Sequence, residues 1–172
     1  MLGQHEARAI AALPSLDWAL ADTLAHRLNR DLATLTDLAA AYKQAHWNVL
    51  GPRFAELHAL FDQFADETRV YVDLVAERAV AVGGVARGTL QAAVECSALP
   101  PFPTGEREEQ RLLQELSRRV DRTVEELREA IGSSAEDPVT QDLYIEIARG
   151  MEKQRWMLLA HLSRQAPNSG DG

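Results

Sequence analysis

The chain has 172 residues, of which 46% are hydrophobic, and its single cysteine is Cys96. A chain of this length buries enough apolar surface to fold as one domain without disulfides or a structural metal. One cysteine cannot form an internal bridge, which is typical of a reducing compartment. No apolar run reaches the roughly 18 residues of a membrane span, and the first residues lack the pattern of a secretory signal. We therefore expect a cytoplasmic protein with no membrane partner.

The formal net charge at pH 7 is -8. An excess of acidic residues repels nucleic acid and anionic membranes and attracts cations. Lysine occurs only at Lys43 and Lys153, and the arginines are scattered along the chain. The sequence therefore contains no basic arm for nucleic acid.

Long helices dominate the expected structure. Leucines recur at spacings of three and four between positions 16 and 38, the period of one apolar helix face, and predict a helix over residues 15–48. Gly51 and Pro52 end it. A second helix is expected over residues 54–82, because apolar residues continue to the glycines at 83 and 84.

The second half of the chain begins with a crossover over residues 84–105, which contains a short helical stretch at 90–94. Thr104 is the expected N-cap of a third helix that runs to about residue 131 and ends at Gly132. Asp137 followed by Pro138 predicts the start of a fourth helix, which ends near residue 163. We expect residues 15–164 to form the folded domain, 1–14 to be a flexible segment and 165–172 a disordered tail.

Four long helices with a long crossover between the second and third predict an all-α, ferritin-like four-helix bundle. Such bundles commonly bind two iron ions through a Glu-x-x-His motif on each of two helices. None of the five histidines here has a glutamate three positions before it. This absence argues against a di-iron centre of that type within one chain.

Potential metal ligands occur instead along the second helix. His58 and Asp62 are four residues apart, as are Asp73 and Glu77, and at about 100° per residue all four share one face. The two pairs are separated by about 22 Å along the axis, at 1.5 Å per residue, which is too far for one metal site.

Two chains can complete the site. If two such helices pack antiparallel across a two-fold axis near Glu67 and Thr68, the first pair of one chain faces the second pair of the other. His46, at the end of the first helix, adds a further nitrogen. Two imidazoles with three carboxylates suit iron, with manganese or zinc as competitors.

Simpler interpretations of these residues remain open. Each carboxylate taken singly is more often part of a solvated helix face, and Glu77 with Arg78 could form only an exposed ion pair. His58 could be a hydrogen-bonded core histidine, and His46 beside Trp47 a packing residue.

One part of the sequence closely resembles a known protein family. The resemblance is carried by the run from Lys43 to Pro52, followed by Phe54, Leu57-His58, Phe61-Asp62, the stretch from Asp73 to Arg78 and Gly83-Gly84-Val85-Ala86. The family that these residues resemble is the Dps family of mini-ferritins. The resemblance spans about residues 16–161 and is specific between 43 and 89. It implies a hollow dodecamer of four-helix subunits with ferroxidase sites at two-fold interfaces.

By this resemblance, His46, Asp73 and Glu77 bind the better-occupied iron, and the neighbouring subunit supplies His46. His58 and Asp62 match the weaker second position, and Glu77 is the best candidate to bridge both ions. Trp47 matches a tryptophan near the site that either accepts oxidising equivalents or only packs there; the sequence favours neither.

The resemblance also implies a reaction: oxidation of Fe(II) by hydrogen peroxide, preferred over dioxygen, and storage of ferric mineral, which protects the cell from oxidative damage. Asp142, with Glu136 and Glu146 nearby, roughly matches acidic pores of the family, although an ordinary exposed acid is an equally good interpretation for each.

DNA binding is where this sequence departs from the family. Members that compact DNA use lysine-rich tails, whereas residues 1–14 offer only Arg8 and the tail only Arg164 against Asp171. We therefore expect weak or absent DNA binding. The alternative to the ferroxidase is a structural nucleoid protein that compacts and shields DNA.

Overall fold

The computed structural model describes residues 16–163. Over these residues it contains five α-helices, and its only β feature is an isolated parallel bridge between Leu50 and Glu108. The helices are α2 (Trp18–Asn48), α3 (Phe54–Ala81), α4 (Leu90–Cys96), α5 (Glu109–Ser133) and α6 (Pro138–Ser163). The predicted all-α class is confirmed, while the expected flexible segment 1–14 and disordered tail 165–172 lie outside the described residues.

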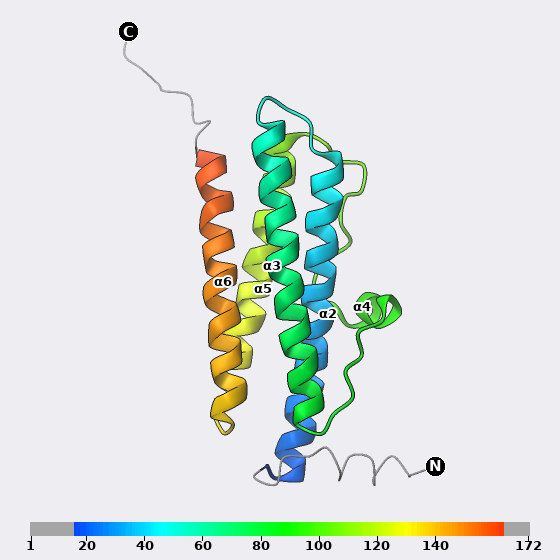
Figure 1. The fold of residues 1–172 in the computed structure, drawn as a ribbon, viewed down its shortest axis with the longest axis vertical. Helices are drawn as coiled ribbons and strands as arrows, with labels where there is room; N and C mark the ends of the chain where they lie inside the picture. Colours follow the sequence, from blue (N-terminus) through cyan, green and yellow to red (C-terminus); the bar gives the residue numbers. More distant parts are fainter. Residues whose placement is uncertain (1–15, 164–172) are drawn as a thin grey trace.

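Four long helices form the bundle (Figure 1). Helix α2 packs antiparallel against α3, and α5 packs antiparallel against α6. The crossover runs back along the length of the bundle, so that α3 and α5 point the same way, and it carries the short helix α4 on the outer side of α2. This is the predicted ferritin-like arrangement.

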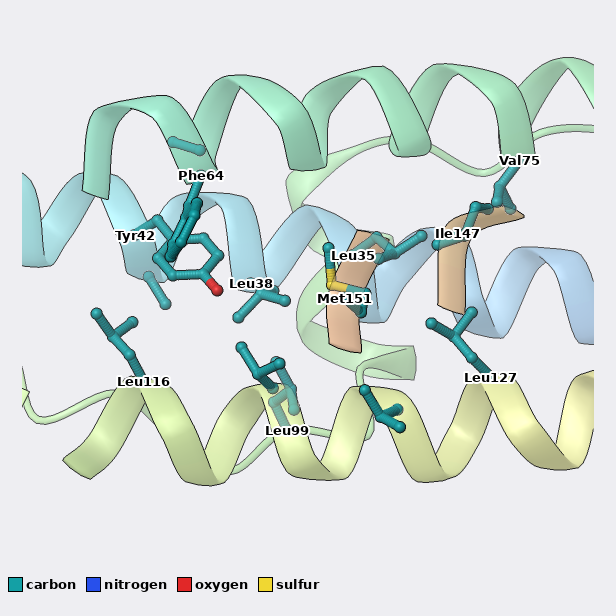
Figure 2. Packing of buried hydrophobic residues seen from close by; sticks show 14 of the residues in the cluster. Leu35, Leu38, Tyr42, Phe64, Val75, Leu99, Leu116, Leu127, Ile147 and Met151 are labelled. Carbon is teal, nitrogen blue, oxygen red and sulfur yellow. The ribbon is translucent and has the colours of Figure 1, made fainter. Parts of the chain in front are cut away.

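The core is a single cluster to which all four long helices contribute (Figure 2). The leucine stripe of α2 is buried from Leu24 to Leu38, and Tyr42 is completely covered, its hydroxyl donating to Oε1 of buried Gln154 at 2.9 Å. Burial is the largest cause that raises the pKa of Tyr42 well above its ordinary value. The stability of the bundle therefore comes mainly from apolar burial, and the residues at the helix ends only determine where each helix starts and stops.

The ends of α2 and α3 agree closely with the sequence pattern. Helix α2 ends at Asn48 as predicted, and α3 ends one residue earlier than predicted, with Val82 as its C-cap. Gly83 follows at φ 90°, a left-handed conformation that glycine adopts without steric cost.

The predicted start of the third helix is wrong, and its predicted end is one residue early. Helix α5 begins at Glu109, and its N-cap is Glu108, whose carboxylate accepts from the backbone N–H groups of Gln110 and Arg111. Thr104 cannot start the helix because the chain after it is drawn towards the α2–α3 turn, where Leu50 N–H donates to the Arg107 carbonyl at 2.8 Å. At the other end, α5 continues through Gly132 to Ser133.

Within the described part of the chain, no helix combines the length and the apolarity that crossing a membrane requires.

Candidate metal centre

The turn between α2 and α3 brings His46 and His58 together. Gly51, in this turn, has φ 153°, and a Cβ atom there would lie 2.3 Å from Oε2 of Glu109. That carboxylate binds Arg53, accepting from its backbone N–H and from its Nε, both at 3.0 Å. A glycine is therefore required where the turn passes over Glu109, and the tight connection places the end of α2 beside the start of α3.

The two histidines hold each other in a reciprocal arrangement. Nδ1 of His46 lies 2.8 Å from the carbonyl oxygen of His58, and Nδ1 of His58 lies 2.9 Å from the carbonyl oxygen of His46. Their rings stack with centroids 3.7 Å apart. Because a carbonyl can only accept, both Nδ1 atoms carry a proton, and in the neutral imidazole this leaves the lone pair of each ring on Nε2.

This arrangement is the one that metal-binding histidines use. A ligating imidazole normally donates its other N–H to a backbone carbonyl or a carboxylate, which fixes the tautomer and the ring orientation. The simpler interpretations, His46 as a packing residue and His58 as a core histidine, account for one hydrogen bond each. They do not explain why both rings leave the same nitrogen, Nε2, without a hydrogen bond to residues 16–163.

Asp62 lies one turn after His58, with its side chain 43% exposed. Lys43 on α2 donates a hydrogen bond to its Oδ1, and Nδ1 of His46 is 4.0 Å from the same oxygen. The hydrogen bond from Lys43 is the largest cause that lowers the pKa of Asp62. One chain thus brings together His46, His58 and Asp62, three of the five predicted ligands.

Asp73 and Glu77 lie on the C-terminal half of α3, exposed, and take part in no hydrogen bond or ion pair among the described residues. The ion pair considered between Glu77 and Arg78 does not form: Arg78 binds Asp137 and donates from Nε to Thr140 at 2.8 Å. Nowhere in residues 16–163 do three histidine, cysteine or acidic side chains come close enough to hold a metal ion. His46, His58 and Asp62 lie near one another without forming such a cluster, and Asp73 and Glu77 lie apart from them, so the five predicted ligands form two separate groups within one chain.

Lys43 is the one residue at the centre that the sequence pattern did not single out. It lies three residues before His46, and its Nζ is 5.9 Å from the ring centroid of Trp47. Trp47 is 67% exposed, so within one chain it is not packed in the core. The sequence feature that could have pointed to it is a lysine one turn before His46 in a chain with only two lysines.

The acidic residues considered for a pore, Asp142, Glu136 and Glu146, are all exposed.

Comparison with known proteins agrees with this fold. Residues 25–166 match the model of the ferritin-like domain. The DNA protection during starvation protein of Agrobacterium fabrum is 38% identical over 141 residues, which cover 81% of this chain and 87% of that protein.

Solved structures of Dps proteins are also similar to this chain in fold. A Dps structure from Mycobacterium smegmatis superposes with a TM-score of 0.85 at 32% identity, covering 88% of this chain and 92% of that one. Dps from Microbacterium arborescens, in its high iron form, gives a TM-score of 0.79 at 34% identity over 88% of this chain and 99% of that one. The chain belongs to the Dps family of ferritin-like proteins.

Proposed function

We propose that this protein is an iron-storing ferroxidase. It oxidises Fe(II) with hydrogen peroxide, or more slowly with dioxygen, at sites shared by two chains, and it stores the ferric product inside a hollow homo-oligomer, a dodecamer. Membership of the Dps family supports iron storage and protection, and the high iron form of the similar Microbacterium arborescens protein is consistent with it. The observation that carries the proposal is the pair of imidazoles whose Nε2 atoms are both left available.

In this proposal each site combines the two groups of ligands from different chains. His46, His58 and Asp62 come from one chain, and Asp73 and Glu77 come from its partner. The imidazoles supply two neutral nitrogens and the carboxylates three negative charges, a donor set that suits Fe(II) and also admits Mn(II) or Zn(II). Because Asp73 and Glu77 have no hydrogen-bond or ion-pair partner among residues 16–163, a second chain can use them without breaking a contact within that part of the chain.

The chemistry requires two ferrous ions held close together. Each gives up one electron, and the two electrons, with two protons, reduce one hydrogen peroxide to two waters. A single ferrous ion would supply only one electron and release a hydroxyl radical. The task of the residues is to bind and position both substrate ions, and Glu77 is the carboxylate best placed by the family pattern to bridge them.

Stopped-flow measurement of Fe(II) oxidation by hydrogen peroxide tests this proposal. The double variant Asp73→Ala with Glu77→Ala should oxidise Fe(II) at least about tenfold more slowly than the wild type, since it lacks two ligands of every site. The matched control is Glu125→Ala with Glu129→Ala on α5, an equally spaced pair whose side chains are 64% and 63% exposed. An unchanged rate in the first variant would show that the site is elsewhere.

Direct DNA compaction is the competing function, and the name of the Agrobacterium fabrum relative refers to DNA protection. We propose that protection by this chain comes from removing iron and peroxide, because its net charge of -8 opposes binding to phosphates.

A further inference from the structure

The exposed face of α3 carries an ion pair midway between the two groups of ligands. Nη1 of Arg69 lies 2.8 Å from Oδ1 of Asp66, and the two side chains are 55% and 68% exposed. Glu67, beside them in sequence, turns away and accepts from buried Gln154 at 3.1 Å, and Thr68 is completely buried. At the middle of α3, therefore, Asp66 and Arg69 are the charged residues that face outward.

The positions of these two residues coincide with the register of the proposed site. At about 100° per residue, Asp66 and Arg69 fall on the same face as Asp62 and Asp73. In an antiparallel pair of α3 helices that sets His58 opposite Glu77, the two-fold axis passes midway between positions 67 and 68. That axis also sets Asp66 of one chain directly opposite Arg69 of the other, and the same contact is repeated on the other side of the axis.

We propose that Asp66 and Arg69 are positioning residues that fix the register in which a second copy of this chain docks on α3. Each carboxylate pairs with the guanidinium of the partner, so the two ion pairs are self-complementary across the axis. A shift of three residues in either direction would place Asp66 opposite the partner's Asp66 or Arg69 opposite the partner's Arg69, and interfaces strongly disfavour such like-charge contacts. This proposal rests on the proposed function, because the register is the one that unites the two groups of iron ligands.

The rest of the face fits the same occupant. In this register Val80, 47% exposed, lies opposite Ala55 of the partner, and Ala59 lies opposite Ala76 of the partner. Small and apolar residues at the ends of the face let two helices approach closely, with the charged pairs at the centre. A second copy of this chain therefore meets opposite charges at the axis and small or apolar side chains at the ends of the face. Between them Asp62 faces the partner's Asp73, two carboxylates whose charge the proposed iron ions would neutralise.

Charge reversal with rescue between chains tests the proposal. Asp66→Arg alone places four guanidinium groups at the axis, and Arg69→Asp alone places four carboxylates there. Each variant by itself should sediment as smaller assemblies than the wild type and lose Fe(II) oxidation. A one-to-one mixture of the two should recover both the wild-type assembly and the activity, because each chain then carries what the other lacks. An intrahelical role of the pair cannot be rescued by another chain.

The double variant Asp66→Arg with Arg69→Asp keeps the pair in reversed order and should assemble like the wild type, which also guards against a single variant that fails to fold. Circular dichroism checks helix content in each, and Glu125→Arg on α5 shows what loss of another exposed i,i+3 ion pair does to thermal unfolding. Wild-type assembly by either single variant, or no recovery in the mixture, would overturn the proposal. Recovered assembly together with a wild-type protein that does not oxidise Fe(II) would leave the register intact and overturn the proposed function.

Discussion

Lys43 donates a hydrogen bond to Oδ1 of Asp62, so the carboxylate predicted for the second iron position already neutralises a cation within its own chain. The ammonium group of Lys43 occupies a position beside the Asp62 carboxylate that a metal ion would take, so an arriving ion must displace it. The two iron positions of one site should therefore differ in affinity, because only one of them competes with a lysine.

Replacing this lysine tests that competition. In Lys43→Met, Fe(II) should bind the second position roughly two- to fivefold more tightly, the range expected for a partly exposed ion pair, while the first position is unchanged. Anaerobic titration calorimetry resolves the two steps. Lys153→Met, at the other lysine of the chain, is the control, and equal titration curves for wild type and Lys43→Met would show that the ion pair does not affect the metal.

The contact between α3 and the start of α6 should make stability depend on pH. Asp137 is buried, which by itself would raise its pKa, yet hydrogen bonds from Thr140 and Arg78 lower that pKa below the ordinary 3.8. A carboxylate with a lowered pKa stabilises the fold above pH 3.8 and loses this contribution as the pH falls through its folded value.

Asp137→Asn should therefore lower the free energy of unfolding at pH 7 by about 1–3 kcal/mol, because Arg78 loses a charged partner. Urea denaturation at pH 7 and below pH 3 measures the difference, which should shrink at the lower pH. A deficit that is the same at both values would assign it to packing.

The glycine of the α2–α3 turn offers a stability test that reaches the site. Gly51→Ala forces a strained φ and drives Cβ into the Glu109 carboxylate, so we expect a loss of about 1–3 kcal/mol, measured by thermal unfolding. Gly132→Ala is the matched control, because nothing lies within 4 Å of its added Cβ and it sits inside α5, where alanine should add up to about 1 kcal/mol. Equal effects of the two substitutions would rule out the turn as the source of the strain.

A gel shift with duplex DNA at low salt tests the expected absence of DNA binding. The assembled protein should leave the DNA unretarded, since its net charge is -8 per chain and residues 1–14 and 165–172 contain no lysine. A retarded complex that disappears with added salt would show that the arginines suffice for binding.

The helices were predictable where the signal is local. The Gly51-Pro52 break gives the end of α2 and the start of α3 to the residue, and the leucine period gives the start of α2 to within three residues, because both signals depend on neighbouring positions. Thr104 failed as a helix start because the real start depends on Leu50, more than fifty positions away, which holds Arg107 in an extended segment.

The same distinction between local signals and contacts distant in sequence applies to the candidate site. Helix geometry alone shows that His58 and Asp62 share a face with Asp73 and Glu77 and that one chain keeps the pairs apart. The contacts of Lys43 with Asp62 and of Arg78 with Asp137 join different helices, and no periodicity encodes them. The reciprocal hydrogen bonds of His46 and His58 depend on backbone carbonyls, which are the same in every sequence.

These reciprocal bonds also link the proposed metal site to the local dynamics of the turn over residues 49–53. Any transient opening that separates the end of α2 from the start of α3 releases both imidazoles at once, so the turn cannot fray while a metal ion holds them. Bound metal should therefore slow hydrogen exchange of the amides that flank the turn, and loss of the ion should return them to the rate of the empty protein.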